Sequence, residues 1–161
     1  MLTKAEQLVV LMLLMTSACT GPMGGSGGTK DDAKHQLTEY ISHSFSVKGP
    51  DDRQQLLSYL TGEAKTRLAA WSDEQFRQAF IENKRQFLNL LIREQKTVSP
   101  SEFEITYEIS YLDRSKGDAK GETKITNKKL AQLHQEGGKW LISDVRNIKD
   151  LIEYRNEMSL P

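Results

Sequence analysis

Strict alternation of apolar and polar residues in the second half of the chain constrains the fold most strongly. Polar residues separate five apolar ones, which are Phe103, Ile105, Tyr107, Ile109 and Tyr111. This period of two predicts a strand with one buried face and one solvated face. Such a strand needs pairing partners and a second layer over its apolar face. The chain must therefore contain a sheet with other elements packed on one side.

Further strands are predicted after this one. A polar loop at 114–121 leads to a long strand at 122–136, in which Leu130 breaks the parity that Ile125 and Leu133 share. This break predicts a bulge near 127–129. Two consecutive glycines, Gly137 and Gly138, predict a hairpin turn before a last strand at 139–147. Residues 87–96 fit either a continued helix or a first strand, and residues 148–158 are expected to form a short terminal helix.

The first half of the chain shows helical spacing instead. Thr29 can cap a helix that begins with two aspartates and ends before Gly49 and Pro50. A second helix is expected over 51–61, and a short helical or turn segment after it. Ser72 begins a capping-box pattern for a third helix. The apolar residues expected to face inward in the first and third helices are Leu37, Tyr40, Ile41, Phe45, Phe76, Ala79 and Phe80.

Helices followed by an antiparallel meander indicate an α+β domain with helices over one face of the sheet. This order, with Gly-Gly-Lys-Trp-Leu-Ile at 137–142, resembles the nuclear transport factor two-like (cystatin-like) superfamily, and the resemblance covers about residues 30–148. It implies a cone-shaped fold in which a bent sheet wraps a pocket under the helices. It implies no particular activity, because members include enzymes, ligand binders, secretion-system subunits and scaffolds.

The first 18 residues have the three parts of an export signal. Lys4 gives a basic start, an apolar run follows at 8–15, and small residues precede Cys19. The apolar run is too short to span a bilayer, which takes about 20 residues. Residues 1–18 are therefore expected to be a signal peptide. There are two alternatives, a secretory signal with a chance cysteine and a buried helix with a core cysteine.

The cysteine indicates the type of signal. Thr-Ser-Ala-Cys at 16–19 resembles the lipobox of bacterial lipoproteins, although that family usually has leucine where Thr16 stands. The resemblance implies that Cys19 is lipidated and that acyl chains attach the mature protein to the membrane, which two or more chains do stably. Thr20 replaces the aspartate that commonly retains such proteins in the inner membrane. This favours the outer membrane, with the domain facing the periplasm.

A glycine-rich segment follows the cysteine. Residues 19–29 contain five glycines and no basic residue, so they cannot form a P-loop and are expected to be a flexible tether. The domain is then expected to occupy 30–161. Cys19 is the only cysteine of the chain, which excludes an internal disulfide framework and any cysteine-cluster metal site.

Charge and histidine content restrict the function further. The chain has 22 basic and 22 acidic residues, which argues against a nucleic-acid binder. His35 and His43 lie two helical turns apart and His134 lies elsewhere, so no metal site is expected. No cofactor is expected either.

The candidate pocket residues come from the strands. Tyr107 and Tyr111 share the inward face of the alternating strand, and Trp140 and Asp144 belong to the last strand. A tyrosine beside a carboxylic acid can form an oxyanion hole, as in ketosteroid isomerase, which shares this general fold. Inward tyrosines are more often core residues, and no Gly-x-Ser-x-Gly elbow is present.

These observations favour a non-enzymatic binding or scaffolding domain anchored to the bacterial envelope. It is expected to act through envelope proteins or a bound small apolar ligand. The alternative is a subunit of an envelope assembly or secretion complex. A small-molecule isomerase or hydrolase is the least favoured interpretation.

Overall fold

Helix α1 (Lys30–Ser46) begins at the predicted cap. In the computed structural model, which describes residues 28–114 and 123–154, the Thr29 hydroxyl accepts a hydrogen bond from the backbone N–H of Asp32. The Asp32 carboxylate accepts one from the backbone N–H of Thr29 at 2.6 Å, which completes a capping box. The predicted signal peptide (1–18) and Cys19 lie outside the described residues.

Shorter helices follow α1. They are α2 (Asp52–Leu57), α3 (Gly62–Ala70) and α4 (Asp73–Phe76), which continues as a π-helical turn, η1 (Arg77–Ile81). The predicted capping box at Ser72 is confirmed. Phe76 is buried, whereas Ala79 and Phe80 are half-buried on the π turn, which the sequence pattern did not distinguish from an α-helix. None of the helices in the described part of the chain is both long and apolar enough to cross a bilayer.

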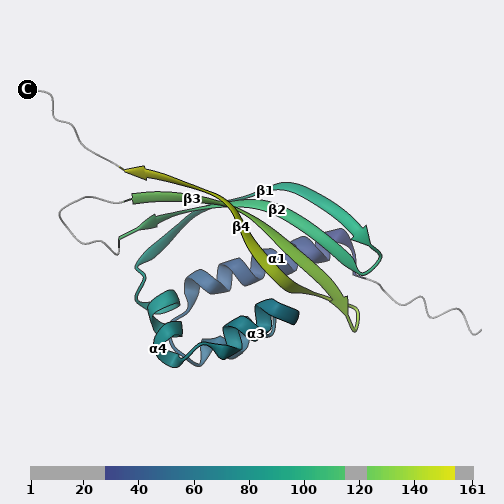
Figure 1. Cartoon of the computed structure of the whole chain (residues 1–161), viewed down its shortest axis with the longest axis horizontal. Helices are drawn as coiled ribbons and strands as arrows, with labels where there is room; N and C mark the ends of the chain where they lie inside the picture. Colours follow the sequence, from purple (N-terminus) through teal and green to yellow (C-terminus); the bar gives the residue numbers. More distant parts are fainter. Residues whose placement is uncertain (1–27, 115–122, 155–161) are drawn as a thin grey trace, which may run out of the picture.

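The strands form one antiparallel meander. They are β1 (Arg85–Ser99), β2 (Glu102–Asp113), β3 (Thr123–Glu136) and β4 (Lys139–Tyr154), paired in the order β1-β2-β3-β4 (Figure 1). The ambiguous segment at 87–96 is therefore strand. The predicted turn joins β3 to β4, and its two glycines have φ of 56° and 82°, the left-handed values that favour glycine in a two-residue hairpin.

The prediction of a terminal helix at 148–158 is wrong. Residues 148–154 continue β4 as a strand, in which Leu151 pairs with Thr126 and Ile152 pairs with Ile125. The helical spacing of a few apolar residues is a weak local preference. The backbone groups of β3 offer a full ladder of hydrogen bonds, so tertiary pairing decides the conformation. Residues 155–161 lie outside the described residues.

The predicted bulge lies at the expected place but in the neighbouring strand. The pairing of β3 with β4 shifts between Lys128 and Lys129, and the extra residue is Ile148 of β4. The pairing of β3 with β2 runs without interruption, so β3 keeps its alternation. Leu130 therefore lies on the other face of β3 from Ala131 and Leu133, which are buried.

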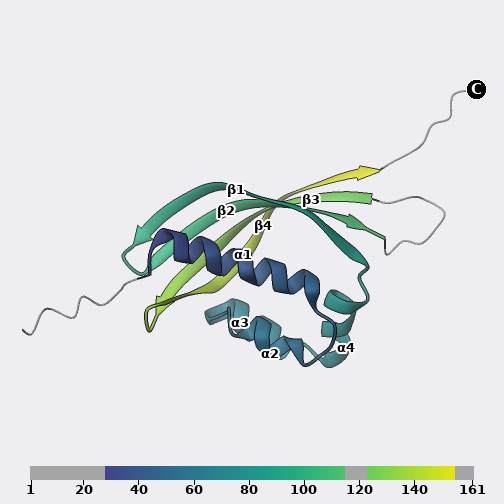
Figure 2. The same ribbon diagram turned by 180° about the vertical axis from the view of Figure 1, so that it is seen from behind.

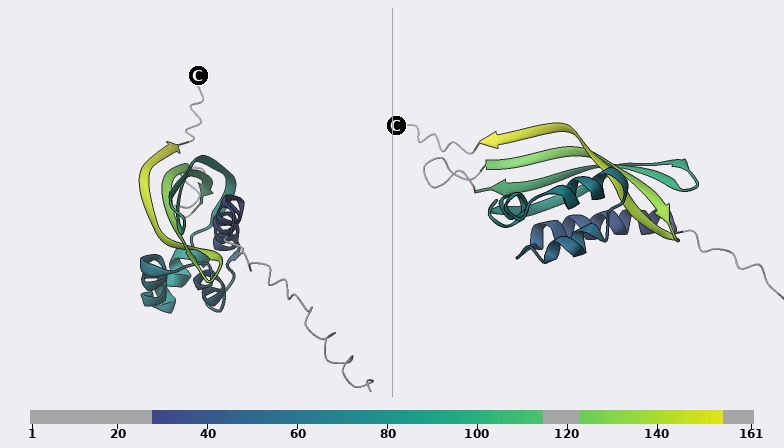
Figure 3. Two further views of the ribbon diagram at one scale, coloured as in Figure 1. Left: turned by 90° about the vertical axis from the view of Figure 1, so that its right-hand side faces the viewer. Right: turned by 60° about the horizontal axis from the view of Figure 1, so that its bottom comes forward.

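The helices pack on the concave face of the bent sheet, which confirms the predicted α+β architecture (Figures 1 and 2). Figure 3 shows the sheet curling around this layer. Helix α1 contacts β1, β2 and β4, while α3 lies along β4. The largest fully buried side chains are Leu37, Leu56, Phe76, Phe103, Ile105, Leu133 and Ile142.

Backbone hydrogen bonds also join the helical layer to the sheet. The N–H of Ile142 donates to the carbonyl of Tyr59, and the N–H of Thr61 donates to the carbonyl of Ile142, both at 2.9 Å. These bonds form a parallel bridge between Leu60 and Ile142. The loop after α2 is thus fixed to β4, which positions α3 beside this strand.

Candidate functional site

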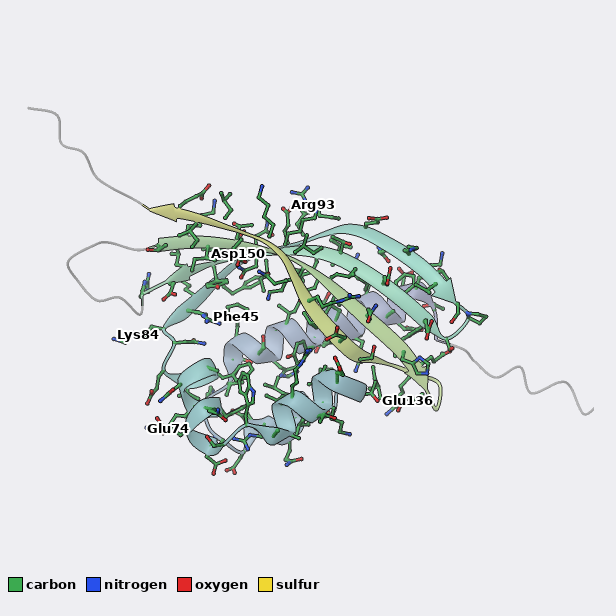
Figure 4. All side chains as sticks on the ribbon, viewed as in Figure 1. Phe45, Glu74, Lys84, Arg93, Glu136 and Asp150 are labelled. Atoms are coloured by element: carbon green, nitrogen blue, oxygen red, sulfur yellow. The ribbon has the colours of Figure 1, made fainter. Side chains whose placement is uncertain are left out.

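A cavity of about 480 Å³ lies between the second half of α1 and the concave face of the sheet. This volume is in the usual range of small-molecule sites. Its apolar wall consists of Ile41, Phe45, Phe80, Ile109 and Val145. Figure 4 shows Phe45 in the space between the sheet and the helices, whereas Arg93 projects from the opposite side of the sheet. The apolar wall would suit the hydrocarbon part of a ligand.

Tyrosines form a second wall. Tyr107 and Tyr111 face the cavity from β2, and Tyr40 faces it from α1. Burial raises the pKa of Tyr107 and Tyr40, so both phenols stay protonated at neutral pH. No described residue forms a hydrogen bond with either hydroxyl. Both are therefore available as donors.

The facing wall is polar and comes from β3 and β4. Asn127 and Asn147 donate to Oδ1 of Asp150, with N···O distances of 2.5 and 2.8 Å. These two bonds hold the pKa of Asp150 below its usual value, so this side chain is a carboxylate at neutral pH. Its role in the site is to accept, not to donate, hydrogen bonds.

Lys129 lies beside this carboxylate on the same wall. It pairs with Tyr107 in the register of β2 and β3, and with Asn147 in that of β3 and β4. Burial lowers its pKa, and the positive charge of Arg85 lowers it further, while Asp150 opposes both effects. Within the described chain no carboxylate forms an ion pair with the Lys129 ammonium group. This cation is therefore half-buried and lacks a bonded counterion among the described residues.

Arg85 completes the charged part of the cavity. It is the first residue of β1, and its guanidinium carbon lies 5.2 Å from the centre of the Tyr111 ring. This is within the range of a cation–π interaction. The ring of Phe45 also packs against Tyr111, with the two ring centroids 5.9 Å apart. Tyr111 is thus in contact with both a cation and an aromatic side chain.

The structure brings together only two of the four predicted pocket residues. Tyr107 and Tyr111 line the cavity, whereas Asp144 and Trp140 lie outside it. A register shift at Ser143 places Asp144 toward α3, where its carboxylate accepts a hydrogen bond from Arg67 at 2.5 Å. The tyrosine–aspartate arrangement considered from the sequence is therefore not formed by Asp144.

Trp140 has a structural position instead. It is 6% exposed, its ring centroid lies 6.0 Å from that of Phe103, and its indole N–H donates to the carbonyl of Gly28 at 3.0 Å. The last residues of the predicted tether therefore contact the β3–β4 hairpin. A Cβ atom added at Gly28 would approach the indole ring to 3.0 Å, which only glycine avoids.

Five polar residues on the sheet side of the cavity were missed from the sequence. They are Arg85, Asn127, Lys129, Asn147 and Asp150. The inward parity of Asn127 and Lys129 could have been read from Ile125 and Leu133, which share it. Asp150 could not, because it lies beyond the bulged residue Ile148 in a segment expected to be helical.

The histidines do not enter this cavity. His43 lies 3.6 Å from Glu39 on α1, and His134 lies 4.0 Å from Glu102 at the other end of the sheet. His35 is exposed. Among residues 28–114 and 123–154, no group of three or more His, Cys, Asp or Glu side chains is arranged to hold a metal ion.

No family model matches the chain, and no curated protein matches its sequence. Among solved structures, the intermembrane space region of the chloroplast protein ARC6 is similar, with a TM-score of 0.55 at 10% identity over 75% of this chain and 97% of that one. A putative scytalone dehydratase from Novosphingobium aromaticivorans gives a TM-score of 0.47 at 8% identity over 81% and 93%. At such low sequence identity, the similarity shows the fold alone. The structure has the α+β fold that the element order predicts, with helices packed on one face of a four-stranded antiparallel sheet.

Proposed function

We propose that this protein is a lipid-anchored envelope protein whose domain binds a small ligand in the cavity under α1. The observation that carries the proposal is the cavity itself, which combines an apolar wall with polar groups that have no partner among the described residues. Hydroxyl and ammonium groups that line a cavity of ligand size, with no bonded partner in the described part of the chain, can bond a ligand directly. This arrangement favours a binding role over a purely structural one.

Binding accounts for these groups better than catalysis does. The hydrogen bonds from the Asn127 and Asn147 side-chain amides keep the pKa of Asp150 low, which makes this carboxylate a weak general base. The raised pKa of Tyr107 makes its phenol a poor acid, and Asp144 is paired with Arg67. We therefore propose a non-enzymatic domain. A hydrolytic or isomerising activity that is lost on changing Tyr107 or Asp144 would contradict this proposal.

Filling the cavity is expected to abolish ligand binding. Ser44 lies on the cavity side of α1, so Ser44→Phe places an aromatic ring in the space between helix and sheet. Neutral phenylbutanol is a suitable probe, and we expect its affinity for the full chain in lipid nanodiscs to fall about tenfold or more in titration calorimetry, after subtraction of empty nanodiscs. Ser42→Phe is the matched control, because Ser42 is exposed on the same helix. Equal affinities of the two variants would contradict a binding role for the cavity.

The anchor is proposed from the N-terminal sequence. A short apolar run followed by small residues and Cys19 supports lipidation of this cysteine, and Thr20 supports a final location in the outer membrane facing the periplasm. We expect Cys19→Ala to remove the acyl chains and the membrane attachment. Intact-mass spectrometry of membrane-extracted protein checks this, since the wild-type mass should begin at residue 19 and include acyl chains. An unmodified wild-type mass that begins at Met1 would contradict the anchor.

A second candidate function is docking of an envelope partner, as expected for a subunit of an assembly or secretion complex. Strand β1 is an edge strand with exposed apolar side chains, of which Leu88 is 42%, Leu91 40% and Val98 50% exposed. Edge strands of this kind can accept an extended segment of another protein. Under this alternative the full chain co-purifies with envelope proteins, and the Ser44→Phe substitution leaves that association unchanged.

A further inference from the structure

The cavity has a surplus of positive charge. Arg85 and Lys129 are cationic, and Asp150 is the single carboxylate among the described lining residues. Asp150 already accepts two amide hydrogen bonds, whereas Lys129 has no bonded counterion in the described part of the chain. Arg85 has Asp113 as its cross-strand partner, whereas the Lys129 ammonium group lacks a bonded carboxylate in the described part of the chain, and a ligand with one negative charge would supply one.

Hydrogen-bond donors surround the same place. Tyr107 is the direct cross-strand partner of Lys129, so both side chains project from the same face about 5 Å apart at their Cβ atoms. Tyr40 reaches the site from α1 and lies near enough for its phenol to raise the pKa of Tyr107. Two hydroxyl groups and one ammonium group thus border one region of the cavity. A carboxylate, with several acceptor sites, matches such a set of donors.

The remaining lining suits an uncharged body. Ile41, Phe45 and Phe80 come from the helical layer, and Ile109 and Val145 from the sheet. None of these side chains offers a hydrogen bond. A ligand that lies against these side chains can therefore be apolar away from its charged group.

We infer that the cavity binds a monoanionic amphiphile, a small carboxylate with an aliphatic or aromatic body, whose headgroup contacts Lys129 and the hydroxyls of Tyr40 and Tyr107. This inference rests on the proposed ligand-binding function and narrows the ligand from apolar to acidic. A cationic ligand would meet the surplus charge of Arg85 and Lys129. A dianion would exceed this surplus and would repel Asp150.

A matched pair of ligands tests the inference. Phenylbutyrate and phenylbutanol have the same apolar body and differ in the headgroup. We expect phenylbutyrate to bind the full chain in nanodiscs about tenfold more tightly, since a charge-assisted hydrogen bond is stronger than one between neutral groups. Lys129→Gln should remove this difference by weakening phenylbutyrate alone, and Lys129→Arg should largely keep it. Titration calorimetry of both ligands with each protein measures these affinities.

Lys128→Gln is the matched control for the charge. Lys128 neighbours Lys129 in β3 but lies on the opposite face, across from Glu108. Lys128→Gln should leave the affinities for both ligands unchanged. Unaltered phenylbutanol binding by Lys129→Gln would show that the Lys129→Gln variant is folded. Equal binding of the two ligands to wild type would overturn the acidic ligand but leave the binding function intact. Binding of neither ligand would overturn both.

Discussion

Replacing Phe76 with alanine is expected to lower the free energy of unfolding by about 3–5 kcal/mol. Phe76 has no exposed surface, and its ring centroid lies 4.9 Å from that of Phe80. The guanidinium of Arg53 covers the ring, with its carbon 4.7 Å from the centroid. Truncation removes the buried ring, leaves a cavity at the junction of α4 and η1, and eliminates the cation–π interaction.

The destabilisation should extend to the junction of α3 and α4, which Arg53 connects. Its guanidinium donates to the carbonyls of Trp71 and Ser72, each at 3.2 Å, and lies 2.9 Å from Asp73. Urea denaturation followed by circular dichroism measures the change. Phe87→Ala is the control, because Phe87 is 43% exposed at the start of β1 and should cost less than about 1.5 kcal/mol. Similar losses of stability in the two variants would show that Phe76 is not a core residue.

Local sequence patterns predicted most elements of the fold because their signals are short-range. The capping boxes at Thr29 and Ser72, the alternation of β2 and the turn at Gly137 each depend on residues within a few positions. The end of β4 could not be predicted in this way. Its strand conformation depends on pairing with β3, across a bulge at Ile148 that reverses the apparent pattern.

The candidate site was only half predictable for the same reason. Tyr107 and Tyr111 lie on a strand whose parity is clear, so their inward direction follows from the alternation. Asp144 follows the irregular residue Ser143 and turns toward Arg67 instead of the cavity. The direction of Asp150 could be predicted only by knowing that the last strand continues past Asn147. Prediction of side-chain direction fails after a bulge, because one extra residue exchanges the two faces.

Replacing Trp140 with alanine is expected to cost about 3–5 kcal/mol of the free energy of unfolding. The indole is buried against Phe103, where the β3–β4 hairpin meets the first described residues. Its N–H donates to the carbonyl of Gly28, just before the cap of α1. Truncation of this side chain removes a large apolar surface from the core and frees the start of the domain from the hairpin.

The phenylalanine variant separates the ring from its hydrogen bond. Trp140→Phe keeps most of the apolar packing but leaves the Gly28 carbonyl without its donor, so we expect a destabilisation of about 1–2 kcal/mol. Chemical denaturation followed by circular dichroism gives both values. Trp71→Ala is the matched control. Trp71 is the other tryptophan of the chain and is 36% exposed, so its replacement should destabilise the domain less than Trp140→Ala does. If Trp140→Phe costs as much as Trp140→Ala, the hydrogen bond to Gly28, and not burial of the ring, attaches the tether end to the domain.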